Sequence, residues 1–163
     1  MLRRRRGVTS LEFATGAGAL MLMLLASMEA SLQLATGMAL EWSAGRASRF
    51  GITGAAAPAG APSAEAPGCR SAAIRWLVGH ATGGFLGDAG LTVETESFPD
   101  MTQAQSGTPG IAGPGSGGEV VRYRFAYRRP FVTPVATTLT GRTEFVHRVE
   151  LLVQNEPFRN ATC

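Results

Sequence analysis

The 163-residue chain contains no lysine, only two cysteines and only two histidines, and these shortages exclude several kinds of chemistry. Without lysine there is no GxxxxGK[ST] phosphate loop, so the glycine- and proline-rich stretch 107–118 is predicted to be a flexible connection. Cys69 and Cys163 form no CxxC pair, which excludes the zinc and redox motifs built on that spacing. His80 and His147 are too few for a zinc site of their own, and no GxSxG motif occurs. We therefore expect no enzymatic activity, no metal and no cofactor.

Positive charge is scarce once the N-terminus is set aside. All 15 basic residues are arginines, and four of them form the block 3–6. Beyond residue 7, 11 arginines face 12 acidic residues. A chain whose excess positive charge lies in a short N-terminal block is not typical of nucleic-acid-binding proteins, so no nucleic-acid partner is expected.

Proline is absent before Pro58, and charge is absent between residues 13 and 28. These two absences favour one long helix over residues 8–50. The uncharged run measures roughly 24 Å as a helix, slightly less than the hydrocarbon thickness of about 30 Å. Glu29 and the more polar residues after it are expected at a wetter far end. The helix is therefore predicted to be transmembrane in its first half and to emerge from the membrane in its second.

The arginine block predicts the orientation of this helix in the membrane, and one acidic residue lies inside its apolar segment. Arginines ahead of an apolar segment hold that end on the cytoplasmic side of a membrane. Glu12 lies just inside the apolar segment, where a carboxylate is costly and usually meets a partner charge. A secretory signal peptide would share the charged start and the apolar run. Glu12 and the lack of an Ala-x-Ala site at the usual distance argue against that interpretation.

Small residues recur on the buried part of the predicted helix. Ala14 and Gly18 form a small-xxx-small pair, a pattern that lets two helices approach closely. We predict close helix packing there, although alanine and glycine are abundant throughout the chain.

The remainder of the chain predicts a small domain behind a linker. Residues 51–68, rich in glycine, alanine and proline, are expected to be the linker, and residues 69–163 the exported α+β head. Cys69 opens a short helical pattern whose apolar face comprises Ala73, Ile74, Leu77, Val78 and Ala81. Alternating patterns predict strands at 91–98, 120–129 and 143–153, with an extended connection over 130–134. His147, on the last strand, is interpreted as a satisfied edge histidine rather than a ligand.

The predicted fold class is therefore α+β: a long N-terminal transmembrane helix followed by a small antiparallel-sheet head. We expect three or four strands and one short helix in that head.

The strand at 120–129 carries arginines on one face and aromatic side chains on the other. Arg122, Arg124 and Arg128 alternate with the apolar residues Val121, Tyr123, Phe125 and Tyr127. In one interpretation the aromatic face lies in the core and the arginines lie in water, paired with Glu94 or Glu150. In the other, the arginines form a basic stripe for an acidic partner such as a neighbouring subunit.

The two cysteines suit an exported domain. A Cys69–Cys163 disulfide would close a loop of about 90 residues and contribute roughly 4–5 kcal/mol in the chain-entropy model. If the domain were cytosolic, two free buried thiols would be expected instead.

The N-terminal motif resembles that of a known family. The run Arg-Arg-Arg-Arg-Gly followed by Val-Thr-Ser-Leu-Glu-Phe-Ala, residues 3–14, is similar to the N-terminus of type IV pilin-like proteins. More narrowly, it resembles that of the TadE-like minor pilins, or pseudopilins, of the tight-adherence (Flp) pilus system. Residues 44–49 are similar to the family's alanine- and arginine-rich helix end. The stretch Val-Gln-Asn-Glu-Pro-Phe, residues 153–158, is similar to its closing motif.

The resemblance implies a processing step and an assembly step. A prepilin peptidase would cut after Gly7 and make Val8 the new N-terminus, with Glu12 as the fifth residue and Phe13 beside it. Cleavage bares an α-amine one helical turn from the Glu12 carboxylate. In an assembly, Glu12 of one subunit could neutralise the amine of a neighbour, since a buried unpaired charge is expensive. Alternatively, Glu12 reaches the lipid headgroups and has no partner.

The resemblance also implies a location and partners. The chain would be a minor pilin in the bacterial inner membrane, single-pass, with its N-terminus cytoplasmic and its head periplasmic, or extracellular once in a pilus. Its partners would be membrane lipid, other pilins and pseudopilins, the prepilin peptidase and the inner-membrane assembly platform, in a pathway for cell adhesion or secretion. The alternative function is a single-pass membrane protein whose periplasmic domain binds a ligand and never assembles.

Overall fold

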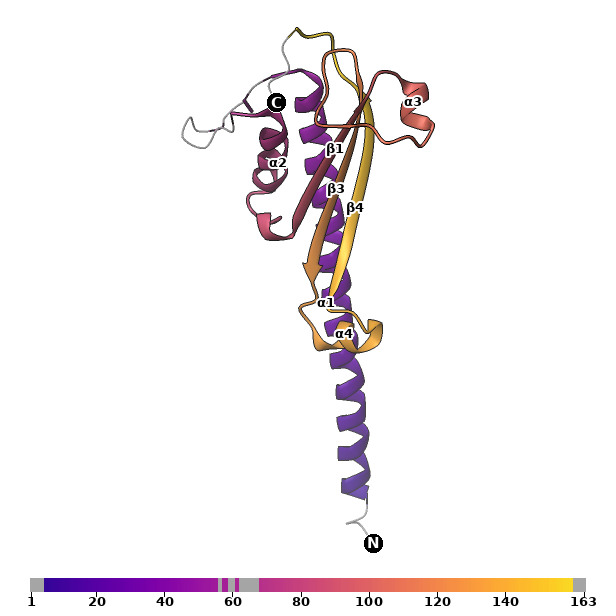
Figure 1. The fold of residues 1–163 in the computed structure, drawn as a ribbon. Coiled ribbons are helices and arrows are strands. Elements are labelled where there is room, and N and C mark those ends of the chain that lie inside the picture. Colours follow the sequence, from indigo (N-terminus) through magenta and orange to yellow (C-terminus); the bar gives the residue numbers. More distant parts are fainter. Residues whose placement is uncertain (1–4, 56, 59–60, 62–67, 160–163) are drawn as a thin grey trace. The chain divides into compact units, whose positions relative to one another are not determined.

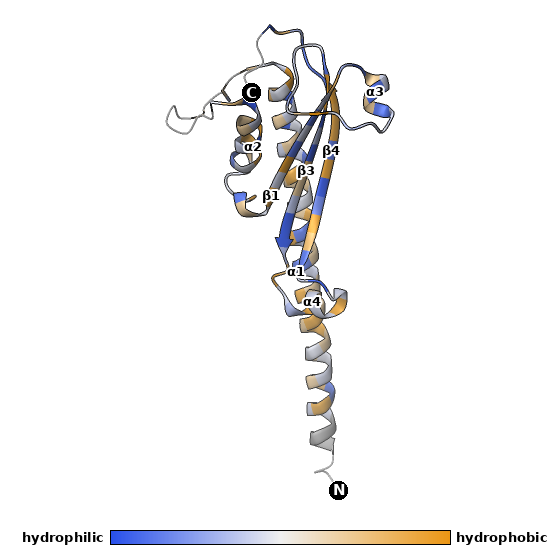
Figure 2. Ribbon diagram, viewed as in Figure 1, coloured by the Kyte–Doolittle hydropathy of each residue, from blue (hydrophilic) through white to orange (hydrophobic). Residues whose placement is uncertain are grey.

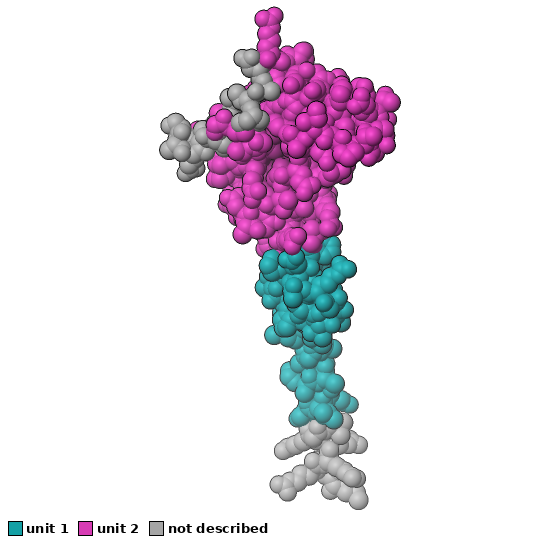
Figure 3. Space-filling model, in the orientation of Figure 1, with its two compact units in different colours: residues 1–35, 130–145 teal, residues 36–129, 146–163 magenta. Residues whose placement is uncertain are grey.

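The computed structural model describes residues 5–55, 57–58, 61 and 68–159, with side chains from Thr9 onward. It divides into two units, coloured separately in Figure 3. Unit 1 comprises residues 1–35 and 130–145, and unit 2 comprises residues 36–129 and 146–163. Helix α1 (Arg5–Ile52) contributes to both, so the predicted single long helix is confirmed.

Unit 2 is built around a four-stranded antiparallel sheet in the order β2-β1-β3-β4. The strands are β1 (Leu91–Phe98), β2 (Ile111–Ala112), β3 (Val120–Pro130) and β4 (Glu144–Gln154). In the central pair Val93 lies opposite Phe125 and Glu96 opposite Arg122. The alternation of apolar and polar residues predicted the ends of the three long strands to within one residue. Strand β2 was not predicted.

The core of unit 2 lies between the sheet and two helices, as Figure 1 shows. Val121, Tyr123 and Phe125 of β3 are almost completely buried there. Helix α2 (Arg70–Ala81) contributes an apolar face that the sequence predicts correctly, and the last third of α1 contributes small side chains. The buried residues of these two helices include Leu40, Ala44, Ala47, Ala73, Ile74, Leu77 and Val78.

The opposite face of the sheet is covered at one end by helix α3 (Met101–Gln105). Asp100 begins this helix, and its side chain accepts a hydrogen bond from the backbone N–H of Gln103. Ala104 of α3 forms a second, small apolar cluster with Phe98 and Val120. The remainder of this face carries charged side chains.

Unit 1 combines the N-terminal part of α1 with a short helix, α4 (Pro134–Thr140). Thr133 caps α4 and Pro134 occupies its first turn, where proline's fixed φ and missing N–H suit a helix start. Gly141 ends it with a left-handed φ of 65°, a conformation that favours glycine. The prediction of an extended connection over 130–134 therefore holds only up to Thr133.

Two further sequence predictions need correction. The head contains α3, α4 and a 3₁₀ turn (η1, Asp88–Gly90) in addition to α2, not one short helix. The stretch 107–118, predicted as a flexible connection, contains β2 and is fixed by side-chain hydrogen bonds. Of the predicted linker 51–68, only residues 51–55, 57–58, 61 and 68 are described, so the domain boundaries stay predictions.

Candidate functional site

The N-terminal half of α1 exposes its apolar side chains. Large apolar residues from Leu11 to Met28 are mostly half or more exposed, with Phe13 at 77%. Figure 2 shows this part of α1 mainly in white and orange. By length and composition α1 can cross a membrane, or act as a signal sequence. An apolar surface of this size marks an interaction with lipid or with another protein.

The residues predicted to serve processing and assembly lie on this same stretch. Gly7 and Val8 belong to the helical backbone, while their side chains are outside the described part. Positions 8 and 12 are one helical turn apart, and Glu12 and Phe13 are exposed. No contact in the described chain assigns them a role, so processing at Gly7 and assembly through Glu12 stay predictions.

Ala14 and Gly18 lie one turn apart on an exposed part of α1. A Cβ atom added at Gly18 would meet no other atom within 4 Å. Within the described residues nothing packs against this position, so the predicted close helix packing would involve another molecule.

Glu29 is the acidic residue that unit 1 buries. Its side chain is 5% exposed, although the sequence suggested a wet position. Oε2 accepts hydrogen bonds from the backbone N–H groups of Val132 (3.0 Å) and Thr133 (2.9 Å). Oε1 accepts a hydrogen bond of 2.8 Å from the side-chain amide of Gln33. The carboxylate thus holds the segment that leads into α4 against α1.

Beside this clamp, α1 and α4 enclose an apolar groove of about 580 Å³. Leu22, Met23 and Ala26 line it from α1, and Pro134, Val135 and Leu139 line it from α4. Leu139 remains 78% exposed at its rim. Water would find few hydrogen-bond partners in such a groove.

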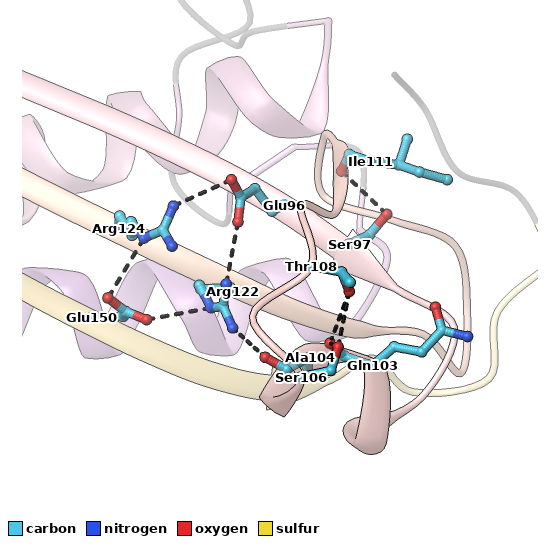
Figure 4. A network of polar contacts seen from close by, with 10 residues as sticks. All are labelled: Glu96, Ser97, Gln103, Ala104, Ser106, Thr108, Ile111, Arg122, Arg124 and Glu150. Atoms are coloured by element: carbon cyan, nitrogen blue, oxygen red, sulfur yellow. Dashed lines mark hydrogen bonds and ion pairs between the residues drawn. The ribbon is translucent and has the colours of Figure 1, made fainter.

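The charged face of the sheet in unit 2 carries a balanced network, drawn in Figure 4. Arg122 and Arg124 of β3 lie between Glu96 of β1 and Glu150 of β4, at distances of 3.2–3.5 Å. Arg122 also donates a hydrogen bond to the carbonyl of Ala104 in α3. The pairing with Glu150 confirms that part of the first interpretation, with Glu96 in place of Glu94. The Arg122 side chain is largely buried, however, and does not lie in water. Arg122 and Arg124 are therefore neutralised within the chain and do not form an unpaired basic stripe.

A second polar cluster in unit 2 explains the C-terminal motif. The buried Arg70 guanidinium donates to the carbonyls of Pro114 (2.6 Å) and Gly115, and it lies 4.8 Å from the ring centroid of Phe158. Asn155 donates to the carbonyls of Pro114 (3.0 Å) and Ser116 (2.9 Å). The motif residues Asn155 and Phe158 thus fix the glycine-rich loop, which is a structural role.

The same motif reaches the end of α1. The backbone N–H of Glu156 donates to the carbonyl of Ile52 at 2.9 Å. Residues 155–158 therefore tie together the end of α1, the loop 114–116 and the start of α2, all within unit 2.

The titratable groups of the core show no catalytic pattern. Burial raises the pKa of Tyr123 to about 12, against a smaller opposite effect of Arg70, so this phenol stays neutral. Burial, assisted by the charge of Arg129, lowers the pKa of His147, whose ring faces Gly37 of α1. The His80 ring stacks on the Trp76 ring, with 4.1 Å between the ring centroids. No group of three metal-ligating side chains occurs among the described residues, and the absence of an enzymatic role stays a prediction.

Cys69 precedes α2 as its N-cap residue, with Sγ 3.1 Å from the Ser71 hydroxyl oxygen. Cys163 lies outside the described residues. The described part of the chain therefore cannot display a Cys69–Cys163 disulfide, and the bridge stays a prediction.

Comparison with known proteins adds no further assignment: no protein-family model, no curated protein and no solved structure matches the chain. The architecture itself is consistent with a pilin-like one, because a long N-terminal apolar helix precedes and packs on a four-stranded antiparallel sheet.

The sequence analysis did not predict the burial of Glu29 or the helix α4. Glu29 binds the turn that precedes α4 in unit 1. The sequence does contain a signal for α4: Thr133-Pro134 is a typical N-cap and first-turn pair, and Gly141 follows at the helix end. The two backbone N–H groups that bind Glu29, those of Val132 and Thr133, lie 103 and 104 positions away along the chain. No local pattern predicts a contact at that separation.

Proposed function

We propose that this chain is a membrane-anchored pilin-like subunit, a minor pilin or pseudopilin of the TadE-like type. The observation that carries the proposal is the exposed apolar surface of α1 from Leu11 to Met28. An apolar helix that leaves its side chains uncovered within its own chain needs lipid or other subunits around it.

A second observation also supports the proposal: the single helix α1 supplies both the apolar anchor and part of the core of unit 2. The N-terminal part of α1 is uncharged from Phe13 to Met28, whereas Leu40, Ala44 and Ala47 of the same helix belong to the core of unit 2. A detachable signal peptide would not be expected to continue into a core helix. This arrangement favours an anchor that the mature protein keeps.

In the proposed function, the arginine block holds the N-terminus on the cytoplasmic face of the bacterial inner membrane. A prepilin peptidase removes residues 1–7, and the head lies in the periplasm or, after assembly, in an extracellular pilus. The new α-amine of Val8 and the Glu12 carboxylate pair between neighbouring subunits on the assembly platform. Pairing of this kind selects matched subunits, because an unpaired buried charge is costly. The pathway would be a tight-adherence pilus or a related secretion system.

N-terminal sequencing of the protein isolated from membranes tests the processing step. We expect the mature chain to start at Val8, because the peptidase would cut after Gly7. A chain that keeps its arginine block contradicts the proposal. It would favour the alternative, a membrane-anchored periplasmic domain that binds a ligand and does not assemble.

Replacing Glu12 with alanine tests the assembly step. Membrane insertion should be unaffected, since the substitution only increases the apolarity of the helix. Co-purification with other pilins should fall by at least about tenfold, the effect of losing about 1.4 kcal/mol of pairing. Glu41→Ala, an exposed acid on the same helix, is the matched control and should co-purify normally. Unchanged co-purification of the Glu12 variant would contradict the pairing.

A further inference from the structure

Unit 1 contains a second uncharged stretch besides the one in α1. No charged residue occurs from Pro130 to Gly141, and Arg129 and Arg142 flank this stretch in the sequence. It includes the whole of α4, whose Leu139 is 78% exposed, and the preceding Val132, which is 61% exposed. Exposed apolar side chains on an uncharged segment suit contact with lipid or with another protein.

The groove beside α4 shows the level of this helix along α1. Its α1 side is lined by Leu22, Met23 and Ala26, which lie within the uncharged run 13–28 and not beyond it. At 1.5 Å per residue, these residues lie roughly 14–20 Å from Phe13 along the helix. A hydrocarbon layer of about 30 Å that starts near Phe13 extends past this level. If α1 crosses the membrane, α4 therefore lies at the depth of the outer leaflet.

Three threonine hydroxyls of α4 are satisfied within the chain. The hydroxyls of Thr137 and Thr138 donate to the carbonyl of Pro134, and that of Thr140 donates to the carbonyl of Ala136, at 2.7–2.8 Å. In lipid, where water is absent, hydroxyls are tolerated when they bond back to their own helix.

Glu29 and the turn before α4 satisfy each other in the same way. The donors to the carboxylate include the N–H groups of Val132 and Thr133, which precede α4 and have no helical acceptor. A carboxylate about 24 Å along the run is thereby shielded from lipid. The clamp removes the cost of leaving these two N–H groups and this carboxylate unpaired in a bilayer.

From these observations we infer that the segment 131–141 inserts into the outer leaflet and that Leu139, Val132 and the groove beside α4 contact lipid acyl chains. The inference rests on the membrane anchoring in the proposed function. It adds a second lipid contact, supplied by a part of the chain more than a hundred positions from the anchor.

Depth-dependent quenching of a single tryptophan tests the inference on the full chain. In a Trp42→Phe/Trp76→Phe background, Leu139→Trp places the probe on α4, Leu20→Trp places it in the anchor, and Thr102→Trp places it on exposed α3. Each variant is reconstituted in vesicles of phosphatidylethanolamine and phosphatidylglycerol that carry brominated acyl chains. We expect the probe at position 139 to lose at least about twice as much fluorescence as the probe at 102, because only the former reaches the acyl chains.

Three results would overturn the inference, and they differ in what else they affect. Quenching at position 20 without quenching at 139 leaves the anchor intact and removes the lipid contact of α4. Absence of quenching at both positions removes the anchor as well, and with it the proposed function. Quenching at 139 that disappears as the protein density in the vesicles rises identifies a second copy of the chain, not lipid, as the occupant of this face.

Discussion

Replacing Glu29 with alanine is expected to release the segment before α4 from α1. The substitution removes the common acceptor of the Val132 and Thr133 N–H groups, and Thr133 is only 3% exposed. A buried donor left without an acceptor costs about 1–3 kcal/mol, so local opening of this segment should become easier by about 2–4 kcal/mol. Hydrogen exchange measured by mass spectrometry on the peptide 131–136 should accelerate by roughly 30- to 1000-fold.

Two variants separate this effect from a general loss of stability. Glu41→Ala removes an exposed acid from the same helix and should leave exchange in 131–136 unchanged. Glu29→Gln keeps one acceptor oxygen and should give an intermediate rate. If Glu29→Ala exchanges at the wild-type rate in this peptide, the carboxylate does not hold the segment.

The elements that the sequence predicts well are those with a strong local pattern. Alternation of Val121, Tyr123 and Phe125 with arginines fixes the two faces of β3, because successive side chains of a strand point to opposite faces. The absence of proline and charge in the first part of the chain similarly fixes α1. In both cases the element follows from a pattern among neighbouring residues.

The elements that the sequence misses depend on contacts between distant segments. The sequence predicts a solvent-exposed Glu29, but Gln33 and the turn at Val132 cover its side chain and bind its carboxylate. Helix α3 is short and depends on Asp100 and on the apolar pocket of Phe98 and Val120, which only the folded sheet assembles. Two-residue β2 pairs with Glu96 and Ser97 and has no pattern of its own.

The predicted role of the candidate assembly residues depends on a second subunit, which the structure of one chain does not contain. The sequence singles out Glu12 because a carboxylate in an apolar run is costly, and the structure places it on an exposed helix surface. A pairing between subunits requires a neighbour, so the structure of one chain does not test it. The C-terminal motif is the opposite case: Asn155 and Phe158 supported a family resemblance, and the structure gives them internal contacts.

Replacing Gly51 with alanine is expected to destabilise unit 2 by about 1–3 kcal/mol through overpacking. A Cβ atom at this position near the end of α1 would lie 2.2 Å from the Tyr123 hydroxyl oxygen and 2.9 Å from its Cζ. The Tyr123 ring is fully buried and cannot swing into solvent, and the added Cβ atom would also lie 3.4 Å from Cδ1 of Ile74. Thermal or chemical unfolding in detergent micelles, followed by circular dichroism, measures the change.

A matched control on the same helix distinguishes the clash from the ordinary effect of glycine in a helix. Gly45→Ala meets no atom within 4 Å and should be neutral or stabilising by up to about 1 kcal/mol, because alanine is the better helix former. Adding Tyr123→Phe to Gly51→Ala removes the nearest clashing atom, together with a buried hydroxyl that has no hydrogen-bond partner among the described residues. The double variant should therefore recover part of the lost stability. Equal stabilities of Gly51→Ala and Gly45→Ala would mean that the end of α1 does not pack against Tyr123 as described.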